Sequence, residues 1–395
     1  MLVEPELPAE LLGGAKEYTD TAIIVISRFS GEGWDRIGVK YEDQTPDEAQ
    51  QTDLSQKVFE NSDFCLTNAE AAMVKAVKEN FAKVVVVLNI GGMMDTSWFA
   101  CDDQISSALL AWQGGIEGGL AAADILVGDV TPSGKLVDSF AKTLEDYPSS
   151  YNFHESNKYA EYTDDIYVGY RYFETFAKEK VLYPFGFGLS YTDFEVTASV
   201  EAGESSVTVA ASVRNSRDRA GQNAVLVYVE APQGKLGKPS RVLAGFGKTP
   251  ELQPGETAEL TISIPKYRFA AFDDSGVTGH RNAYVLEAGT YSIYVGGDVR
   301  SARQAGSFSQ TLEVLSQCEE ACAPVEQFQR IHPTEGWEAV PVRTVDPQDR
   351  RRERMPLEIP QTGDRGWKLK DVHAGTVSLK DFVGQLSDAD LMAMF

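Results

Sequence analysis

The sequence predicts an α/β domain over residues 1–192, followed by an antiparallel β-sandwich over residues 193–315. In the first region continuous apolar runs alternate with helical patterns, which is typical of a parallel or mixed sheet with covered faces. From residue 193 the hydrophobic period changes to two and turn signals recur, as in a sandwich. After residue 315 the pattern loosens, so residues 316–395 are predicted to form a linker and short helices. A chain of 395 residues is long enough for two or three such units.

The α/β domain begins with Thr21–Ile26, an uninterrupted apolar run that predicts a buried strand. Thr67 or Asn68 can cap a helix over Ala69–Phe81, because its apolar residues approximate one helical face. The other elements expected in this domain are the strands Lys83–Leu88, Ile105–Trp112 and Ser133–Asp138 and a helix over Leu120–Leu126.

The sandwich is predicted from strict alternation in Val207–Val213, Leu260–Ile264 and Tyr291–Val295. It carries no catalytic constellation, so we expect it to brace the preceding domain. In the last region, Arg343–Pro360 is expected to be a solvated linker.

Ser378 and Ser387 are expected to cap two helices near the end of the sequence. The second helix is apolar up to Phe395, so we expect a further segment to cover it or the chain to self-associate. Whether the protein forms a homo-oligomer is left open.

The charge balance restricts the partners. Asp and Glu number 59 against 36 Lys and Arg, a net charge of −23, which argues against nucleic acid and anionic membranes and favours a neutral substrate. The sequence has no apolar run of about 18 residues, as a membrane-spanning helix would need. Residues 1–6 carry no basic and apolar signal-peptide pattern, so a cytoplasmic protein is expected.

Neither a metal nor a cofactor is predicted. Cys318 and Cys322 form a C-x3-C pair with no second pair at metal-ligand spacing, and the four histidines are scattered. The glycine cluster Gly114–Gly119 fails the G-x-G-x-x-G spacing of dinucleotide sites. Close packing of a helix on a strand is the simpler interpretation of these glycines.

Residues 146–192 are dense in Tyr and Phe. Such a run could stack on the apolar faces of sugar rings, or it could pack a long segment against the domain. We favour packing.

The loop after the first strand, Gly31-Glu32-Gly33-Trp34-Asp35-Arg36, is the candidate site. Ligands of open α/β sheets bind outside the carboxyl ends of the strands, and this loop follows such an end. Two glycines bracket Glu32, so the backbone can turn sharply and project that carboxylate. An isolated G-E-G triplet is also compatible with an ordinary surface turn.

The strand and this loop resemble the acid/base loop of family-3 glycoside hydrolases, chiefly β-glucosidases. The sequence is similar to that family at several further stretches, and residues 193–315 resemble its fibronectin-III-like domain. These stretches are Val84–Leu88 with Asp95–Trp98, Trp112–Gly119 and Thr131–Leu136. Asp165–Tyr172 and Tyr183–Tyr191 resemble the most recognisable stretches of the family, and together the matches are highly specific.

Residues 361–395 resemble the lead-in to the family's TIM barrel, in members with reversed domain order. The family's nucleophilic Asp lies on that barrel, and its α/β sandwich has strands before the one at Thr21–Ile26. The resemblance therefore implies an incomplete α/β sandwich and a TIM-barrel partner supplied in cis or in trans.

The resemblance further implies a retaining, exo-acting enzyme without metal or cofactor, whose substrate is a β-glucoside or oligosaccharide. Glu32 would be the general acid/base. Trp34 could desolvate Glu32 and Asp35 could repel its charge, both raising its pKa, whereas Arg36 would lower it. We expect Asp35 and Arg36 to pair with each other and fix the loop, leaving Glu32 to titrate.

Two classes of function remain open. One is a part of a β-glucosidase, within which β-xylosidase or exo-glucanase specificity is also open. The other is a non-catalytic carbohydrate-binding or structural subunit, which would not need the carboxylate of Glu32.

Overall fold

The computed structural model describes residues 8–29, 42–153 and 155–394. The chain divides into two compact units. The first comprises Met1–Glu319 with Pro324–Pro341, and the second comprises Glu320–Ala323 with Val342–Phe395.

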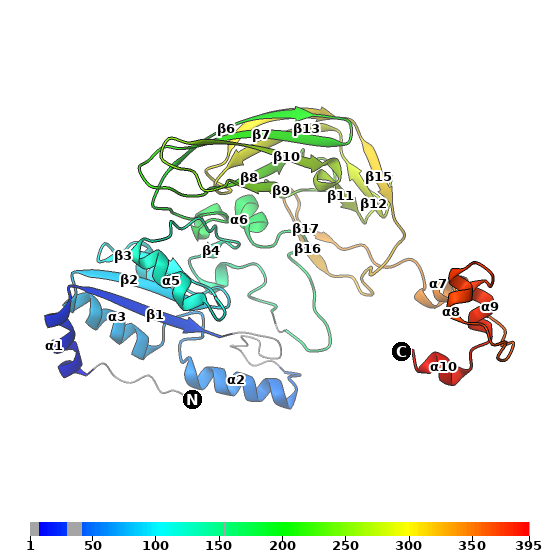
Figure 1. The fold of residues 1–395 in the computed structure, drawn as a ribbon, viewed down its shortest axis with the longest axis horizontal. Coiled ribbons are helices and arrows are strands. Elements are labelled where there is room, and N and C mark those ends of the chain that lie inside the picture. The colour runs from blue at the N-terminus through cyan, green and yellow to red at the C-terminus, as the bar shows by residue number, and fades with distance from the viewer. Residues whose placement is uncertain (1–7, 30–41, 154, 395) are drawn as a thin grey trace. The chain divides into compact units, whose positions relative to one another are not determined.

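The first unit begins with a three-stranded parallel sheet of order β1-β2-β3 (Figure 1). β1 (Thr21–Arg28) and β2 (Lys83–Ile90) run in register, with Ile24 opposite Val86. This confirms the α/β prediction. β3 ends at Leu110, two residues before the predicted end. The helices of this region are α1 (Ala9–Tyr18), α2 (Pro46–Val58), α3 (Asn68–Asn80), α4 (Ser97–Ala100) and α5 (Gly118–Val127), and β3 spans Ile105–Leu110.

Helix α3 covers one face of the sheet because its apolar stripe meets the inward side chains of the strands. Val74 and Val77 pack in one buried cluster with Ile24, Ile26 and Val86. Burying each such side chain contributes about 1.5–3 kcal/mol. The opposite face of β1 leaves its apolar side chains more than half exposed.

The predicted cap of α3 is confirmed at Thr67. Its side chain accepts a hydrogen bond from the amide of Glu70, and the Glu70 carboxylate accepts one from the amide of Thr67. The same capping box, Thr45 with Glu48, begins α2, which the sequence analysis did not identify. Helix α2 is polar and its buried residue is Thr52. It therefore lacks the hydrophobic stripe from which a helix is predicted.

The predicted strand at Ser133–Asp138 is wrong. Leu136 exchanges one pair of backbone hydrogen bonds, each 2.8 Å long, with Gly186 and Phe187. That partner is a turn and not an extended strand, so no ladder forms along the segment. A short strand follows instead at β4 (Phe140–Ala141), which pairs with β5 (Val181–Tyr183). The other elements here are η1 (Leu144–Asp146), α6 (Tyr170–Phe176) and η2 (Lys178–Lys180).

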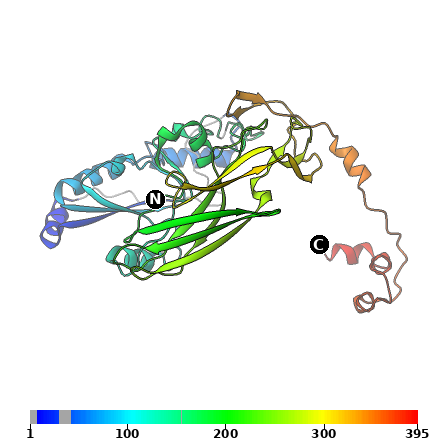
Figure 2. The same cartoon turned by 90° about the horizontal axis from the view of Figure 1, so that it is seen from above.

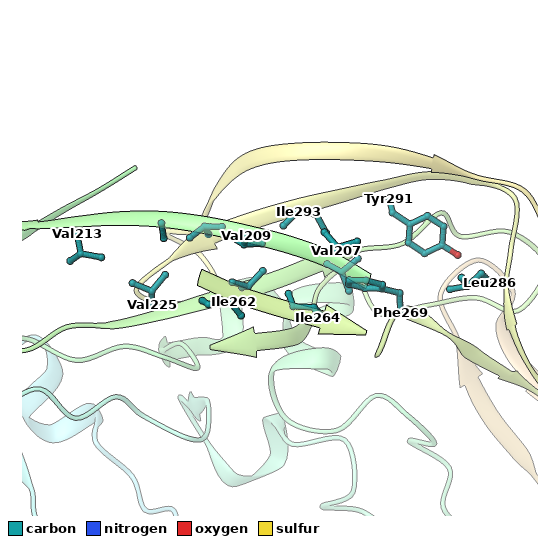
Figure 3. Close-up of a cluster of buried hydrophobic side chains, with 14 of the residues drawn as sticks. Val207, Val209, Val213, Val225, Ile262, Ile264, Phe269, Leu286, Tyr291 and Ile293 are labelled. Atoms are coloured by element: carbon teal, nitrogen blue, oxygen red, sulfur yellow. The ribbon is translucent and has the colours of Figure 1, made fainter. Parts of the chain in front are cut away.

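The predicted sandwich is confirmed as two facing sheets, of order β10-β7-β6 and β14-β13-β8-β9. Figure 3 shows inward side chains of both sheets meeting in one core, including Val207, Ile264 and Ile293. Seen from above, the green strands of the first sheet run side by side (Figure 2). The strands are β6 (Phe194–Ala202), β7 (Ser206–Asn215), β8 (Ala224–Glu230), β9 (Val242–Lys248), β10 (Thr257–Pro265), β13 (Gly289–Gly296) and β14 (Arg303–Gln310).

A smaller antiparallel sheet of order β11-β12-β15 and a hairpin of β16 and β17 complete the first unit. These elements are η3 (Lys266–Phe269), β11 (Ala271–Asp273), β12 (Ala283–Leu286), β15 (Glu313–Gln317), β16 (Gln329–His332) and β17 (Gly336–Ala339).

Helix α6 joins the α/β region to the sandwich. The guanidinium of Arg300 lies 2.9 Å from the buried carboxylate of Glu174, and the hydroxyl of Ser240 donates to the carbonyl of Glu174. The hydroxyl of Tyr170 accepts the amide of Leu243. These partly buried polar contacts connect α6 to the sandwich, and the bracing role of the sandwich stays a prediction.

In the second unit, Ser378 and Ser387 cap α9 (Leu379–Gly384) and α10 (Asp388–Met392), as predicted. The prediction of a linker throughout Arg343–Pro360 is wrong. α7 (Pro347–Glu353) lies within it because Asp346 caps its first turn and proline stands at the first helical position. α8 spans Leu369–His373.

No helix among residues 8–29, 42–153 and 155–394 is long and apolar enough to cross a membrane. The four cysteines are unpaired. The same described residues hold no cluster of three or more His, Cys, Asp or Glu side chains that could bind a metal ion.

Candidate active site

The predicted site residues Glu32, Trp34, Asp35 and Arg36 lie outside the described residues. The described chain shows how the residues on either side of positions 30–41 are held. β1 ends at Arg28, at the carboxyl edge of the parallel sheet, and the chain is described again from Glu42.

Arg28 anchors the end of β1. Its side chain is 2% exposed and forms two hydrogen bonds of 2.7 Å with the carboxylate of Glu70, which is 4% exposed. Its three remaining N–H groups donate to the carbonyls of Ser27, Asp63 and Cys65, each at 2.8 Å. A guanidinium has five N–H donors, so every one of them is used.

The Arg28 guanidinium also lies 4.8 Å from the ring centroid of Phe59, which follows α2. One side chain therefore connects the end of β1, the 59–65 turn and the start of α3. Buried, bidentate arginine–carboxylate pairs are geometrically specific, so this arrangement fixes where the Glu32 loop leaves the sheet.

Asp43 holds the other side of the loop. Its carboxylate accepts hydrogen bonds from the hydroxyl of Ser156 at 2.6 Å and from the amide of Asn157 at 2.9 Å. The Ser156 hydroxyl, then the Asn157 amide, holds the pKa of the Asp43 carboxyl below its usual value of 3.8. This contact joins the aromatic-rich segment to Asp43.

The aromatic-rich segment divides into two groups. Packing is confirmed for Tyr147, Tyr167 and Phe173, which join buried aromatic contacts. The second group is exposed and flanks Ser156 in the sequence: Tyr151, Phe153, Tyr159 and Tyr162.

The Asp95–Trp98 stretch is structural. The Asp95 carboxylate accepts the amide of Ser97, its carbonyl accepts the indole N–H of Trp98, and its own amide donates to Phe64. Burial, and then the charge of Asp95, raises the pKa of the Cys65 thiol, so Cys65 is not activated as a nucleophile.

The glycine cluster at 114–119 makes a turn. A Cβ on Gly114 would lie 2.7 Å from the Cα of Gly118, and Gly115 has a φ of +69°. The expected close packing of a helix on a strand is wrong for Gly118 and Gly119, because a Cβ on either would meet no atom within 4 Å.

Residues 12–191 match the family described as the glycosyl hydrolase family 3 C-terminal domain, and residues 223–299 match the fibronectin type III-like domain. Beta-glucosidase A of Butyrivibrio fibrisolvens is 44% identical over an alignment that covers 100% of this chain and 53% of that protein. The chain belongs to glycoside hydrolase family 3.

Solved structures of β-glucosidases agree with this assignment. A β-glucosidase from Paenibacillus barengoltzii superimposes with a TM-score of 0.87 at 41% identity, covering 98% of this chain and 42% of that one. β-Glucosidase 3B of Thermotoga neapolitana, solved in complex with glucose, gives a TM-score of 0.66 at 35% identity, covering 79% and 41%. The chain thus spans about half the length of its relatives or less.

Sequence reasoning missed the contacts of Arg28 and Asp43, the residues that flank the Glu32 loop. Arg28 stands at the end of an apolar run. A charged residue at the end of a buried strand is rarely buried without a partner, so Arg28 was a signal for one. Its partner Glu70 was visible only as the third residue of a capping box. Nothing in the sequence marked Asp43, whose partners lie more than 110 residues away.

Proposed function

We propose that this chain supplies the general acid/base of a retaining, exo-acting β-glucosidase that removes non-reducing-end β-D-glucosyl residues. The observation that carries the proposal is the alignment of the whole chain with a protein named beta-glucosidase at 44% identity. The glucose complex of a 35% identical relative supports glucose as the sugar.

Glu32 has the acid/base role in this proposal. It is four positions after Arg28 in the sequence, on the loop that leaves the carboxyl edge of the parallel sheet. The clamps at Arg28 and Asp43 support the assignment, because a catalytic carboxyl must be held close to its productive position. Trp34, Asp35 and Arg36 tune or support Glu32 from the same loop.

The reaction needs a second carboxyl. In a retaining glycosidase one carboxylate attacks the anomeric carbon while the other carboxyl protonates the leaving oxygen, and the two lie about 5–5.5 Å apart. We assign the attack to an aspartate of a TIM-barrel domain supplied in cis or in trans. Glu32 then takes a proton from water, and that water releases the sugar with retained configuration.

The test replaces Glu32 by Ala, with Glu42→Ala as the matched control, since Glu42 is an exposed carboxylate just beyond the same loop. Each variant is combined, by fusion or mixing, with the part of the Butyrivibrio relative that this chain does not match. Glu32→Ala is expected to slow cleavage of cellobiose by about 10²–10⁴-fold, whereas Glu42→Ala has little effect.

Two further measurements separate acid/base catalysis from a structural role. A dinitrophenyl glucoside needs no protonation of its leaving group, so its first step should survive in Glu32→Ala. Azide needs no deprotonation, so it should restore turnover and give the β-glucosyl azide. Equal losses for all leaving groups, or an α-azide product, would remove Glu32 from this role. Equal activity of the Glu32 and Glu42 variants would favour a non-catalytic subunit.

A further inference from the structure

A pocket of about 280 Å³ lies between the aromatic-rich segment and the β16–β17 hairpin. The amide of Ile331 donates to the carbonyl of Thr163 at 2.9 Å, which joins the two walls. The hydroxyl groups of Tyr151 and Thr163 lie 2.5 Å apart, so the wall that carries Tyr151 is fixed as well. The site is therefore formed by segments that are far apart in the sequence.

Two aromatic side chains of this pocket remain accessible to a ligand. Tyr151 is 67% exposed and Trp337 is 52% exposed, although both line the pocket. Tyr147, in contrast, packs its ring edge-to-face against Phe173, and its hydroxyl donates to the carbonyl of Ser139 and accepts the amide of Ala141. The negative faces of aromatic rings attract the weakly positive C–H groups that line the flat faces of pyranose rings.

The polar side chains of the pocket are mainly carboxylates. The Asp146 carboxylate forms an ion pair with the Lys180 ammonium group, with 3.1 Å between Oδ1 and Nζ. Glu145 and Asp164 form no ion pair within the described part of the chain. Burial raises the pKa of the Asp164 carboxyl. Free carboxylate oxygens accept hydrogen bonds from hydroxyl groups and repel phosphate and other anions.

We propose that this pocket binds one neutral pyranose ring of a β-glucoside. Tyr151 and Trp337 contact the faces of the ring, and Asp164 and Glu145 accept hydrogen bonds from its hydroxyl groups. The volume is just below the roughly 300 Å³ at which small-molecule pockets begin, which suits a single ring better than an oligosaccharide. The choice of a glucoside rests on the proposed function. Binding at this site does not require Glu32.

The experiment is isothermal titration calorimetry of the 395-residue chain with methyl β-D-glucopyranoside. We expect saturable binding with a millimolar Kd, as is usual for a small and partly open site. Mannitol offers hydroxyl groups without a ring face and should bind much more weakly. Tetramethylammonium chloride is the probe for a cation, the other ligand that aromatic and acidic side chains could accept.

The Tyr151→Ala and Trp337→Ala variants should each weaken glucoside binding by roughly three- to tenfold. Asp164→Asn keeps the side-chain shape and should weaken it to a similar extent. Phe246→Ala is the matched control, because Phe246 is a 72% exposed aromatic side chain of β9 that does not line the pocket. Since Tyr151 and Trp337 are exposed, these variants are expected to keep the circular dichroism spectrum of the parent chain.

The outcomes separate this proposal from the assignment of Glu32. Binding that survives Glu32→Ala but is lost in Trp337→Ala supports the pocket, whatever the activity assays show. Binding lost in Glu32→Ala, or equal binding by Trp337→Ala and Phe246→Ala, would overturn it. Saturable binding of tetramethylammonium without binding of the glucoside would also overturn it and would identify a cation site.

Discussion

Removing either partner of the Arg28–Glu70 pair should strongly destabilise the α/β region. The perturbations are Glu70→Gln, Arg28→Met and the double variant. Glu70→Gln keeps the side-chain size but replaces one carboxylate oxygen by an amide N–H₂ group. That group would face an N–H donor of Arg28, which now bonds to the oxygen. Arg28→Met also leaves the carbonyls of Asp63 and Cys65 without the donors that they have now.

The magnitude follows from burial. Breaking a buried pair leaves an uncompensated charge and typically costs about 3–5 kcal/mol. That is a large part of the roughly 5–15 kcal/mol that stabilises a domain. Because both side chains are at most 4% exposed, water cannot replace the lost partner. The double variant should be less destabilised than the sum of the single variants by roughly 0.5–3 kcal/mol, since Arg28→Met alone leaves the Glu70 charge buried.

The assay is urea unfolding followed by circular dichroism, read as the free energy of unfolding for each transition. The control is Glu79→Gln on the same helix, because Glu79 is 62% exposed and lies 4.0 Å from Lys75. An exposed pair of this kind is worth less than about 1 kcal/mol. If Glu70→Gln unfolds at the same urea concentration as Glu79→Gln, the clamp does not hold the loop end as argued.

Three other groups give predictions: two buried tyrosine hydroxyls of opposite expected effect, and the Asp43 carboxylate, whose contact depends on pH. Tyr228→Phe should leave stability unchanged or raise it slightly, because the buried Tyr228 hydroxyl has no hydrogen-bond partner in the described structure. Tyr291→Phe should lower the free energy of unfolding by about 1 kcal/mol, because that buried hydroxyl donates to a backbone carbonyl at 3.1 Å; equal effects in thermal unfolding would contradict both. The Asn157 amide should be protected from hydrogen exchange at pH values above 3.8, where the Asp43 carboxylate is ionised folded or unfolded, and should lose protection only as pH falls through the lower folded pKa. Loss of protection well above pH 3.8, or no change in Asp43→Ala, would show that this carboxylate does not hold the segment.

The sequence by itself determined the elements whose signals are local. The apolar run at Thr21–Ile26 marked β1 as a strand of the parallel sheet, although β1 lies at the sheet edge and buries only one face. The Thr67 cap is a property of four neighbouring residues. The sandwich was visible for the same reason, since a strand with one buried face must alternate. The family-3 assignment also came from the sequence, through several short stretches spread along the chain.

Local patterns misled the prediction where long-range contacts decide the structure. The segment at Ser133–Asp138 resembles a strand, but its neighbour in space is the 186–187 turn, so it cannot form a ladder. α7 was missed because its arginines were interpreted as a solvated linker, although Asp346 provides a cap.

Only the tertiary structure decided how the residues on either side of the Glu32 loop are held and which aromatic side chains line the proposed sugar pocket. Arg28 and Glu70 are 42 positions apart, Asp43 and Ser156 are 113 apart, and no periodicity connects such residues. The pocket needs Tyr151 and Trp337 together, which come from different segments of the chain. The sequence sets the chemistry of each side chain, but the packing of the core decides which segments, and so which partners, come together. The reason is that contact energies act over a few ångströms in space and not along the chain.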